Sequence, residues 1–440
     1  MTKPLTLKNI IARFRSRWDN APDVRKPNHN TRYRIVDAIL SAFSVFFMQS
    51  SSFLAHQRIL QSKKGRNNAT SLFHIERIPS DPQIRNLLDP LSVQYFHADF
   101  WAILDELDAQ RQLLRFRSDL GSYLIALDGV THFSSEKISC HECLKRQDKQ
   151  GTEHFYHNAI TPVVVKPGQK QVLPLPPEFI VPQDGHEKQD CERAAAKRWL
   201  AQHHEHFADQ TLTYLGDDLY ANQPLCQLIT EIYHQSFIFV CKPDSHTGLY
   251  EWLAFLDKNN AVATLSTRRW NGKHGEIWRY RFVNQIPLRN GNDALNVNWC
   301  ELVISRETTG EILYQNAFIT NHAITAENVA TVVEAGRTRW KIENENNNTL
   351  KTKGYHLEHN FGHGKQHLSN VLVTLNLLAF LVHTIQEITE PAYQTLRQAL
   401  GARKTFFNDL RALTRYIVFD DWEALFQFMA DGLEISLSPP

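Results

Sequence analysis

The hydrophobic positions follow a helical period at the start of the chain. Within Ile10–Trp18 the apolar residues stand three or four positions apart, and a second such series covers Ile35–Phe46, with Arg and Lys on the faces between them. This spacing predicts a small helical domain over residues 1–66, and one more helix is expected over 93–113.

Short apolar runs bounded by turn residues replace the helical period in the middle of the chain. They cover Ser122–Leu127, Phe155–Val165, Leu212–Gly216 and Phe237–Val240. Runs of this length are typical of buried strands. Helical patterns over 190–204 and 223–233 lie between them, and strands that alternate with helices predict an α/β sheet.

From about residue 244 to residue 322 the pattern is strand-like, without helical crossovers. The expected strands are Val262–Ser266, Ile277–Val283, Leu295–Ser305 and Ile312–Thr320. Glycines between them supply the turns, so we predict a β-rich insertion within the α/β domain. Helices are expected again over 325–352, 364–388 and 391–433.

The longest apolar stretch, Val371–Ile385, is interrupted by Thr374, Asn376 and His383. It is shorter than the roughly 20 residues that a membrane-spanning helix needs, so we predict a buried helix and no membrane association. Met1–Asn20 is basic and polar, without the apolar segment of a signal peptide. Six Cys residues outside a small secreted framework are typical of a reducing cytoplasm.

The charge of the chain is distributed unevenly. The 440 residues are 42% hydrophobic and 22% charged, an ordinary composition for a globular protein of two or three domains. The net charge is +1, yet residues 1–66 contain thirteen Lys or Arg and three Asp, a balance of +10 that leaves −9 for the rest. A basic head on an acidic body is typical of a nucleic-acid-binding region joined to a carboxylate site, with Arg13, Arg15 and Arg17 as candidate DNA contacts. A solvated basic arm is the alternative.

Two carboxylates, Asp128 and Asp217, stand at the ends of predicted buried strands. In an open α/β sheet, ligands bind at the carboxyl ends of the strands. Glu343 could complete a set of three from a helix that Trp340 and Ile342 anchor. Three carboxylates suffice to hold two Mg²⁺ ions, about 3.5–4 Å apart, for an in-line phosphoryl displacement. Each residue alone also has an ordinary interpretation, as a turn-forming Asp or a solvated Glu.

The residues around these carboxylates form three motifs. They read Leu127-Asp128-Gly129, Gly216-Asp217-Asp218-Leu219-Tyr220 and Arg339-Trp340-Lys341-Ile342-Glu343. In order and spacing, from Ser122 to Lys353, they resemble the acidic motifs of the DDE transposases of bacterial insertion sequences. The resemblance is to the subgroup with a β-strand insertion before the glutamate. It implies a ribonuclease H-like core, catalysis by Asp128, Asp217 and Glu343 with two Mg²⁺ ions (or Mn²⁺), and DNA as substrate.

The third motif of this family carries Tyr, Arg, Glu and Lys on one helix. Here Arg339 stands one helical turn before Glu343, and Lys351 stands eight residues after it, where the family usually has seven. Gly336 takes the place of the Tyr. The resemblance implies that Arg339 and Lys351 hold DNA phosphates beside the metal ions.

Neighbouring acids leave alternatives for two members of the triad. Asp218 adjoins Asp217, and only one of two successive strand residues points inward. The family's spacing from the Asp to an aromatic residue, here Tyr220, favours Asp217. Glu345 stands close to Glu343, but the Arg-Trp-x-Ile-Glu frame favours Glu343.

The resemblance implies a ribonuclease H-like α/β core interrupted by a β-rich insertion, with helical regions at both ends. The expected parts are a basic DNA-end-binding region at 1–115, the first part of the core at 116–243, the insertion at 244–322, the last part of the core at 323–362 and a helical C-terminal region at 363–440. The expected reaction is nicking at the ends of an insertion sequence, then transfer of the 3′-hydroxyl to target DNA. We expect a homodimer on DNA in the bacterial cytoplasm. The alternatives are a transposase-derived DNA-binding protein that no longer cuts and a zinc-bearing hydrolase.

Cations alternate with aromatic residues inside the insertion. The candidate DNA contacts are Arg268, Arg269, Trp270, Arg279 and Arg281. Such surfaces hold phosphates and stack on unpaired bases. Related transposases use a Trp of this insertion to hold a flipped base, and Trp270, Trp278 and Trp299 are all candidates, with core packing as the alternative for each.

Four histidines follow the predicted Glu343 helix. They are His356, His359, His363 and His367. We interpret Gly354–Leu368 as a DNA-facing loop together with Lys351, Lys353 and Lys365, because its glycines favour irregular backbone. A metal site and a solvated turn are the alternatives.

Cys140, Cys143, His154 and His157 have the spacing C-x₂-C-x₁₀-H-x₂-H. The paired Cys residues have zinc spacing, and the two His residues could close a tetrahedral structural site. Reduced thiols and scattered histidines are the alternative. The acid-dense stretch Asp184–Glu192 is interpreted as a loop and the start of a helix, where negative charge is favourable, rather than as a metal site.

Overall fold

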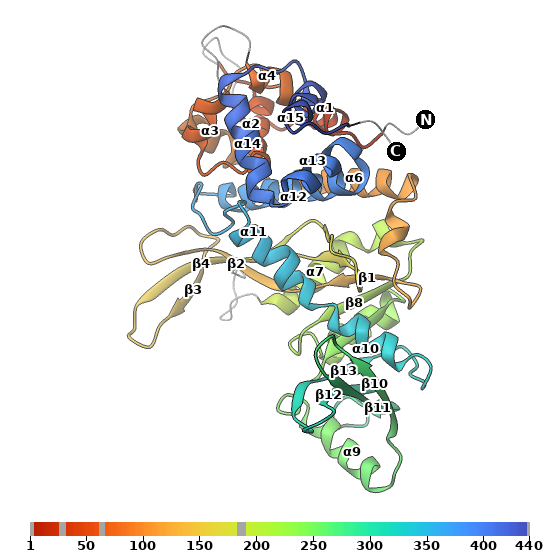
Figure 1. Ribbon diagram of the computed structural model, residues 1–440. Coiled ribbons are helices and arrows are strands. Elements are labelled where there is room, and N and C mark those ends of the chain that lie inside the picture. The colour runs from red at the N-terminus through yellow and green to blue at the C-terminus, as the bar shows by residue number, and fades with distance from the viewer. Residues whose placement is uncertain (1–3, 26–31, 61–66, 183–190, 438–440) are drawn as a thin grey trace.

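A nine-stranded mixed sheet extends from the middle of the protein, at β1 and β8, to the end opposite the helical layer, at β10–β13 (Figure 1). The computed structural model describes the chain except residues 1–3, 26–31, 61–66, 183–190 and 438–440. In sheet order the strands are β10 (Ala263–Trp270), β11 (Gly275–Pro287), β12 (Asn296–Arg306), β13 (Ile312–Thr320), β9 (Ser236–Val240), β8 (Leu212–Gly216), β1 (Tyr123–Ala126), β5 (Val163–Val165) and β6 (Leu173–Pro174). Strands β1, β8 and β9 are parallel to one another, and the strands on either side of them are antiparallel. The predicted α/β sheet is confirmed.

The parallel strands are the apolar runs of the sequence. Every residue of β1 and β8 is buried, and so is β9 apart from Ser236. Continuous apolar runs are typical of parallel strands covered on both faces. Helix α7 (Glu192–His203) precedes β8, and α8 (Gln223–Gln227) with a π-helical turn (Leu228–Ile232) connects β8 to β9. These are the crossovers that parallel strands require.

A smaller second sheet begins directly after Asp128. It contains β2 (Gly129–Ser135), β4 (Glu153–Ile160) and β3 (Leu144–Gln147) in that order, with β7 (Glu178–Ile180) beside β4. The β3–β4 hairpin projects from the body of the protein (Figure 1). Three of the four residues of β3 are exposed, so this strand leaves no apolar run in the sequence and was not predicted.

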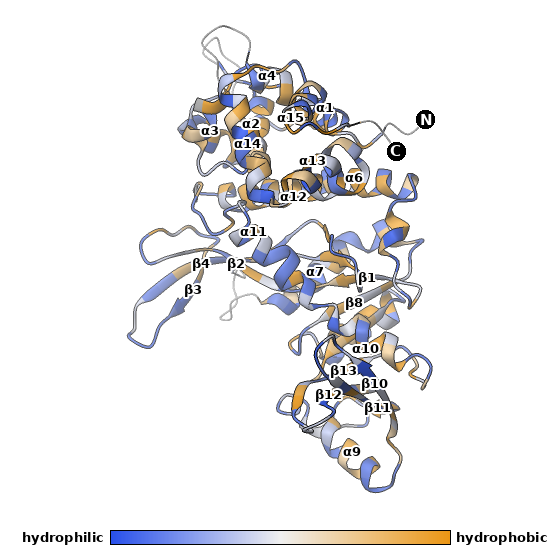
Figure 2. Ribbon diagram, in the orientation of Figure 1, coloured by the Kyte–Doolittle hydropathy of each residue, from blue (hydrophilic) through white to orange (hydrophobic). Residues whose placement is uncertain are grey.

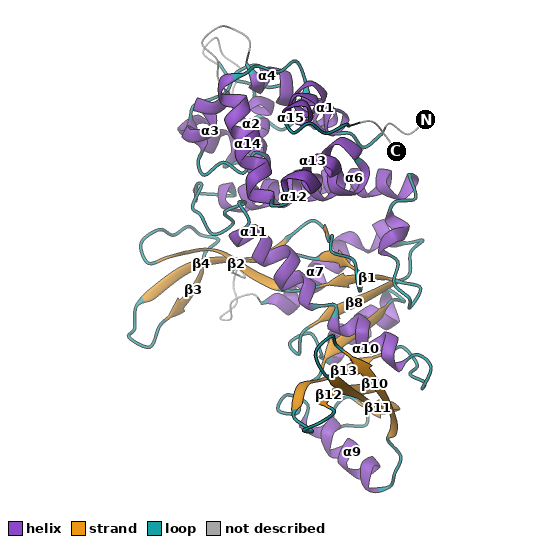
Figure 3. Ribbon diagram, in the orientation of Figure 1, coloured by secondary structure: helices purple, strands orange, loops and turns teal. Residues whose placement is uncertain are grey.

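Helices from both ends of the chain form one layer above the sheet (Figure 3). They are α1 (Leu7–Trp18), α2 (Ile35–Phe47), α3 (Phe53–Leu60), α4 (Asn68–Phe73), α5 (Asp81–Leu88), α6 (Gln94–Ala109), α12 (Leu368–Thr389), α13 (Pro391–Leu400), α14 (Arg403–Tyr416) and α15 (Trp422–Gly432). The Asn68 side-chain amide donates to the Thr414 carbonyl at 2.8 Å, and the Trp422 indole donates to the Leu72 carbonyl at 2.8 Å. The regions 1–115 and 363–440 therefore share one core.

Helix α12 is the centre of this helical layer. Among the described residues it is the one helix long and apolar enough to cross a membrane by length and composition, and the whole of its most apolar window is buried inside the protein. Figure 2 shows apolar residues along it. The prediction of a buried helix is confirmed, because tertiary packing covers the apolar surface.

Two elements of the second half differ from the prediction. The β-rich segment contains a helix, α9 (Thr247–Lys258), before its four strands. The helix expected over 325–352 is divided into α10 (Val329–Arg337), a π-helical turn (Ile342–Asn347) and α11 (Asn348–Thr352). The second difference affects the candidate site, because the π-helical turn carries Glu343.

Candidate active site

Asp128 and Asp217 lie at the same edge of the main sheet. Ala126 of β1 is paired with Leu215 of β8, and the Leu127 N–H donates to the Leu215 carbonyl at 2.8 Å. Two residues further along each strand, this register places Asp128 opposite Asp217. Parallel strands thus bring together two carboxylates that are far apart in the sequence.

A buried hydrogen-bonded bridge connects the Glu343 segment to the same edge. Glu343 lies in the π-helical turn Ile342–Asn347. The Thr161 N–H donates to the Asp128 carbonyl at 3.1 Å, and the Thr161 hydroxyl donates to Asn347 Oδ1 at 3.0 Å. Thr161 therefore positions the turn that carries Glu343 against the strand end that carries Asp128. Such π turns inside helices occur frequently at functional sites.

The anchors of this turn are partly those expected. Ile342 is fully buried, as predicted, but Trp340 is 43% exposed, so its predicted anchoring role is wrong. Lys341 is buried instead, and its ammonium group donates to the Gln169 carbonyl at 2.7 Å. The helical phase therefore turns the Trp340 ring outward, toward solvent.

Gly336 is required by close packing. A Cβ at this position would lie 2.8 Å from Ile238 Cγ2 and 2.9 Å from Phe318 Cδ1. Helix α10 thus approaches β9 and β13 too closely for a larger residue. This packing explains why the chain departs from the Tyr of the motif that it resembles.

The acidic residues interact electrostatically. Burial raises the pKa of Asp128 to about 7; Arg339 opposes the rise, whereas the negative charges of Glu192, Glu343 and Asp217 add to it. The Arg339 guanidinium also forms an ion pair with Glu343, at 2.7 Å. The three predicted carboxylates are therefore within electrostatic reach of one another. A divalent cation relieves this kind of repulsion.

Glu192 is a fourth carboxylate in this group. Burial and the charge of Asp217 raise its pKa, and the Tyr220 hydroxyl donates to Glu192 Oε2 at 3.4 Å. A Cβ at position 129 would overlap the Glu192 carboxylate, so Glu192 lies directly against the backbone next to Asp128. From the sequence, Glu192 was expected only at the start of a helix, although the density of acidic residues beside that helix was a visible signal. Residues 183–190 of the same stretch lie outside the described residues.

The neighbouring acids have other partners. Asp218 Oδ1 accepts the Lys242 N–H at 2.6 Å and lies 3.5 Å from His246 Nε2. Glu345 lines a separate cleft. Asp218 and Glu345 thus have surroundings of their own, and the assignment of Asp217 and Glu343 stays a prediction.

The four carboxylates are not gathered into a metal-ligand set. In the described part of the chain, one group of three or more His, Cys, Asp and Glu residues has ligand atoms that all lie within 4.8 Å of one another, and it is a Cys/His cluster. The Glu343 side chain is half exposed and paired with Arg339. A cation shared by Asp128, Asp217 and Glu343 would require Glu343 to leave this ion pair.

The Cys/His cluster consists of Cys140, Cys143, His157 and His363, and it could bind a metal such as zinc. His154 was predicted as a member, but its Nε2 lies 3.2 Å from Asp148 Oδ2 and it takes no part in the cluster. This assignment is corrected to His363. His154 and His157 are both on β4. The fourth member of the cluster is His363, which lies in a loop more than 200 residues further along the chain, so the spacing of residues in the sequence could not identify it.

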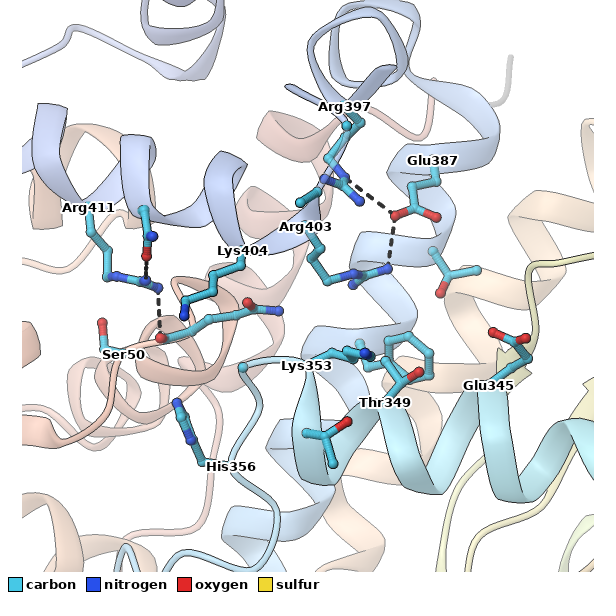
Figure 4. Close-up of a pocket in the computed structure, with 18 of the residues that line it drawn as sticks. Ser50, Glu345, Thr349, Lys353, His356, Glu387, Arg397, Arg403, Lys404 and Arg411 are labelled. Carbon is cyan, nitrogen blue, oxygen red and sulfur yellow. Dashed lines mark hydrogen bonds and ion pairs between the residues drawn. The ribbon is translucent and has the colours of Figure 1, made fainter. Parts of the chain in front are cut away.

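A large basic cleft lies beside the Glu343 helix (Figure 4). Its volume is about 1240 Å³. Of the described residues that line it, the basic ones are Lys170, Lys353, Arg397, Arg403, Lys404, Arg411 and Arg415, and the acidic ones are Glu345 and Glu387. Glu387 is paired with Arg403 at 2.9 Å, so the cleft carries a positive excess in a nearly neutral protein. Figure 4 shows that Glu345 and Thr349 face it from the segment that carries Glu343.

The other lysines and histidines of the predicted DNA-facing loop are dispersed. Lys351 is paired with Glu358 at 2.7 Å, and Lys365 is exposed. His356 lines the basic cleft, whereas His367 lies 2.9 Å from Glu142 and His359 is exposed. The four histidines therefore do not form one metal site.

Arg13, Arg15 and Arg17 form ion pairs inside the helical layer. Their respective partners are Glu106, Asp37 and Asp99. Asp37 and Asp99 are buried, and the Arg15 side chain is only 17% exposed. These cations hold α1 against other helices, which leaves them less available to phosphates than the sequence suggested.

The candidate DNA contacts of the insertion have different surroundings. Trp270, at the end of the edge strand β10, is 69% exposed, and Arg279 is also exposed. Arg268 is paired with Glu307 at 2.7 Å, and Arg281 with Glu301 at 3.0 Å. Arg269 lies over the Trp278 ring, with its Cζ 4.1 Å from the ring centroid.

Of the three tryptophans considered for base contact, Trp270 is the accessible one. Trp299 is 1% exposed and belongs to the core. Trp278 is partly buried, with Arg269 and Arg337 over its ring. The tertiary structure therefore distinguishes by their exposure three tryptophans that the sequence left as equal candidates.

In a comparison with known proteins, no family model and no curated protein matches this chain.

Proposed function

We propose that this protein is a DNA transposase of the DDE type, which nicks the ends of an insertion sequence and transfers the resulting 3′-hydroxyl to target DNA. The proposal is carried by one observation. Asp128, Asp217 and Glu343, which come from three distant motifs of the sequence, interact electrostatically at the carboxyl end of two parallel strands.

The order and direction of the strands support a ribonuclease H-like core. In such a core three antiparallel strands are followed by two strands parallel to the first, and β6, β5, β1, β8 and β9 have this arrangement. Strands β10–β13 extend the same sheet beyond β9 and belong to the segment between Asp217 and Glu343. This is where the resemblance places its β-rich insertion.

The donor set fits Mg²⁺ or Mn²⁺. Asp128, Asp217 and Glu343 offer carboxylate oxygens, which hard divalent cations prefer, and Glu192 adds a fourth negative charge. When bound, two such ions would activate the attacking oxygen and stabilise the leaving oxygen of the phosphodiester. Burial is the main cause of the raised pKa of Asp128 and the neighbouring carboxylates add to it, and a bound cation would oppose both effects.

The remaining residues would orient the DNA. Arg339 would exchange Glu343 for a phosphate oxygen when Glu343 turns toward a metal ion, since its guanidinium already lies at the acidic group. Lys353 would direct the DNA backbone into the basic cleft. Trp270 offers an exposed ring for stacking on an unpaired base.

The assembly follows from the reaction. Two DNA ends must be joined to one target, so we propose a homodimer on DNA in the bacterial cytoplasm, associated with the nucleoid. The Cys/His cluster would hold zinc as a structural ion, because four protein ligands leave no position for a reacting water. This argues against the zinc hydrolase.

The test is a nicking assay on supercoiled plasmid and on end-containing DNA, with Mg²⁺ or Mn²⁺. Asp128→Asn, Asp217→Asn and Glu343→Gln should each reduce cleavage by at least a factor of about 10³ while DNA binding is retained, because each removes a charged metal ligand and keeps the shape. Asp218→Asn is the matched control and should retain cleavage.

Two outcomes would overturn the proposal. Metal-dependent cleavage that survives all three substitutions would place catalysis elsewhere. DNA binding without any metal-dependent cleavage by the wild-type protein would favour the non-cutting DNA-binding alternative.

A further inference from the structure

The Cys/His cluster has the dimensions of a tetrahedral zinc site. Zinc bonds of about 2.3 Å to sulfur and about 2.0–2.1 Å to nitrogen, at the tetrahedral angle, separate two sulfurs by about 3.8 Å, sulfur from nitrogen by about 3.6 Å and two nitrogens by about 3.4 Å. Here the two sulfurs are 3.7 Å apart. His157 Nε2 lies 3.5 Å from Cys140 Sγ and 3.3 Å from Cys143 Sγ. His363 Nε2 lies 3.4 Å from Cys143 Sγ and 3.1 Å from His157 Nε2.

The surroundings orient these four groups. The His363 Nδ1 lies 3.1 Å from the Gly364 carbonyl, which favours the tautomer whose Nε2 lone pair faces the cluster. The Cys140 N–H points at Cys143 Sγ at 3.3 Å, an arrangement that stabilises a thiolate. Cys143, His157 and His363 are each more than nine-tenths buried. Two nitrogens and two sulfurs in a closed tetrahedron are the ligand set that zinc prefers.

The cluster joins parts of the chain that are distant in sequence. Cys140 and Cys143 lie between β2 and β3, His157 is on β4, and His363 lies 220 residues after Cys143 in the loop before α12. Hydrogen bonds also hold the loop before α12 and the start of this helix in place. Glu142 accepts from the Asn370 side-chain amide at 3.0 Å, and Asp89 accepts the backbone N–H groups of Lys365 and Gln366 at 3.0 Å each.

We propose that Cys140, Cys143, His157 and His363 bind one zinc ion that fastens the loop before α12 to the small sheet following Asp128. The ion closes a loop of more than 200 residues between the sheet and the helical layer. Such a closure stabilises the folded chain. The proposal does not depend on the transposase activity.

The experiment compares His363, a member of the cluster, with His154, which the sequence suggested as a ligand but which lies outside it. Wild-type protein, purified without chelators, should contain about one zinc per chain. His363→Ala should lose the bound zinc and lower the melting temperature. His154→Ala should keep both the zinc and the melting temperature, since His154 contacts Asp148 outside the cluster.

A second measurement keeps the test decisive if His363→Ala folds poorly. Cobalt(II) added to zinc-depleted protein should give the visible bands of a tetrahedral site with two thiolates. His363→Cys should still bind cobalt, with the stronger thiolate-to-cobalt band of a three-sulfur site. Equal zinc in His363→Ala and wild type, zinc loss in His154→Ala, or no stoichiometric zinc or cobalt binding would each overturn the proposal.

Discussion

Removal of the Asp128 carboxylate should stabilise the protein at neutral and alkaline pH in the absence of divalent cations. The pKa of Asp128 is raised from 3.8 to about 7 by burial, with Glu192, Glu343 and Asp217 adding to the rise against Arg339. Between these two pH values the folded protein keeps a proton that the unfolded chain has lost. Stability must therefore fall as pH rises through this window, and Asp128→Asn should remove the fall.

The magnitude follows from the size of the rise. A change from 3.8 to about 7 corresponds to about 4 kcal/mol once the group is ionised in both states. Because the Asp128 side chain is only partly buried, solvent reaches it and reduces the free energy that corresponds to this pKa change. We therefore expect Asp128→Asn to exceed the wild type by between about 1 and about 4 kcal/mol at pH 8, with the two proteins converging near pH 4.

The assay is urea unfolding at several pH values between 4 and 8 in buffers free of Mg²⁺ and Mn²⁺. Asp119→Asn is the matched control, because Asp119 is exposed, and it should leave the pH dependence unchanged. Added Mg²⁺ should stabilise the wild type and have little effect on Asp128→Asn, because the ligand binds the folded protein through this carboxylate. A stability difference that does not grow between pH 4 and pH 7 would refute the reasoning.

Two further predictions concern the cleft and the packing of α10. Replacing both Lys353 and Lys404, which line the basic cleft, with Gln should lower the slope of log K for DNA binding against log salt by about one to two. Lys258→Gln is the control, because Lys258 is exposed on α9. If the wild type, the double variant and the control all have the same slope, the DNA does not bind in the cleft. Gly336→Ala should cost about 1–3 kcal/mol in urea unfolding despite the better helix propensity of Ala, because its Cβ would lie 2.8 Å from Ile238 Cγ2. A variant as stable as the wild type would contradict this packing argument.

Local patterns were sufficient for the elements that form the sheet edge. The apolar runs before Asp128 and Asp217 became the buried parallel strands β1 and β8, because a strand covered on both faces must be apolar throughout. The long apolar run within α12 became a buried helix. Strand β3 could not be found in this way, since most of its residues face solvent.

The sequence by itself determined which residue types carry chemistry: acids at two strand ends, a Cys pair with zinc spacing, and cations in excess at the N-terminus. Only the tertiary structure decided which of them meet. It added Glu192 to the acidic group, replaced His154 by His363 in the Cys/His cluster, and engaged Arg15 in a structural ion pair. The physical reason is that spacing within one element fixes the direction of neighbouring side chains, whereas contacts between elements depend on how their buried surfaces pack together.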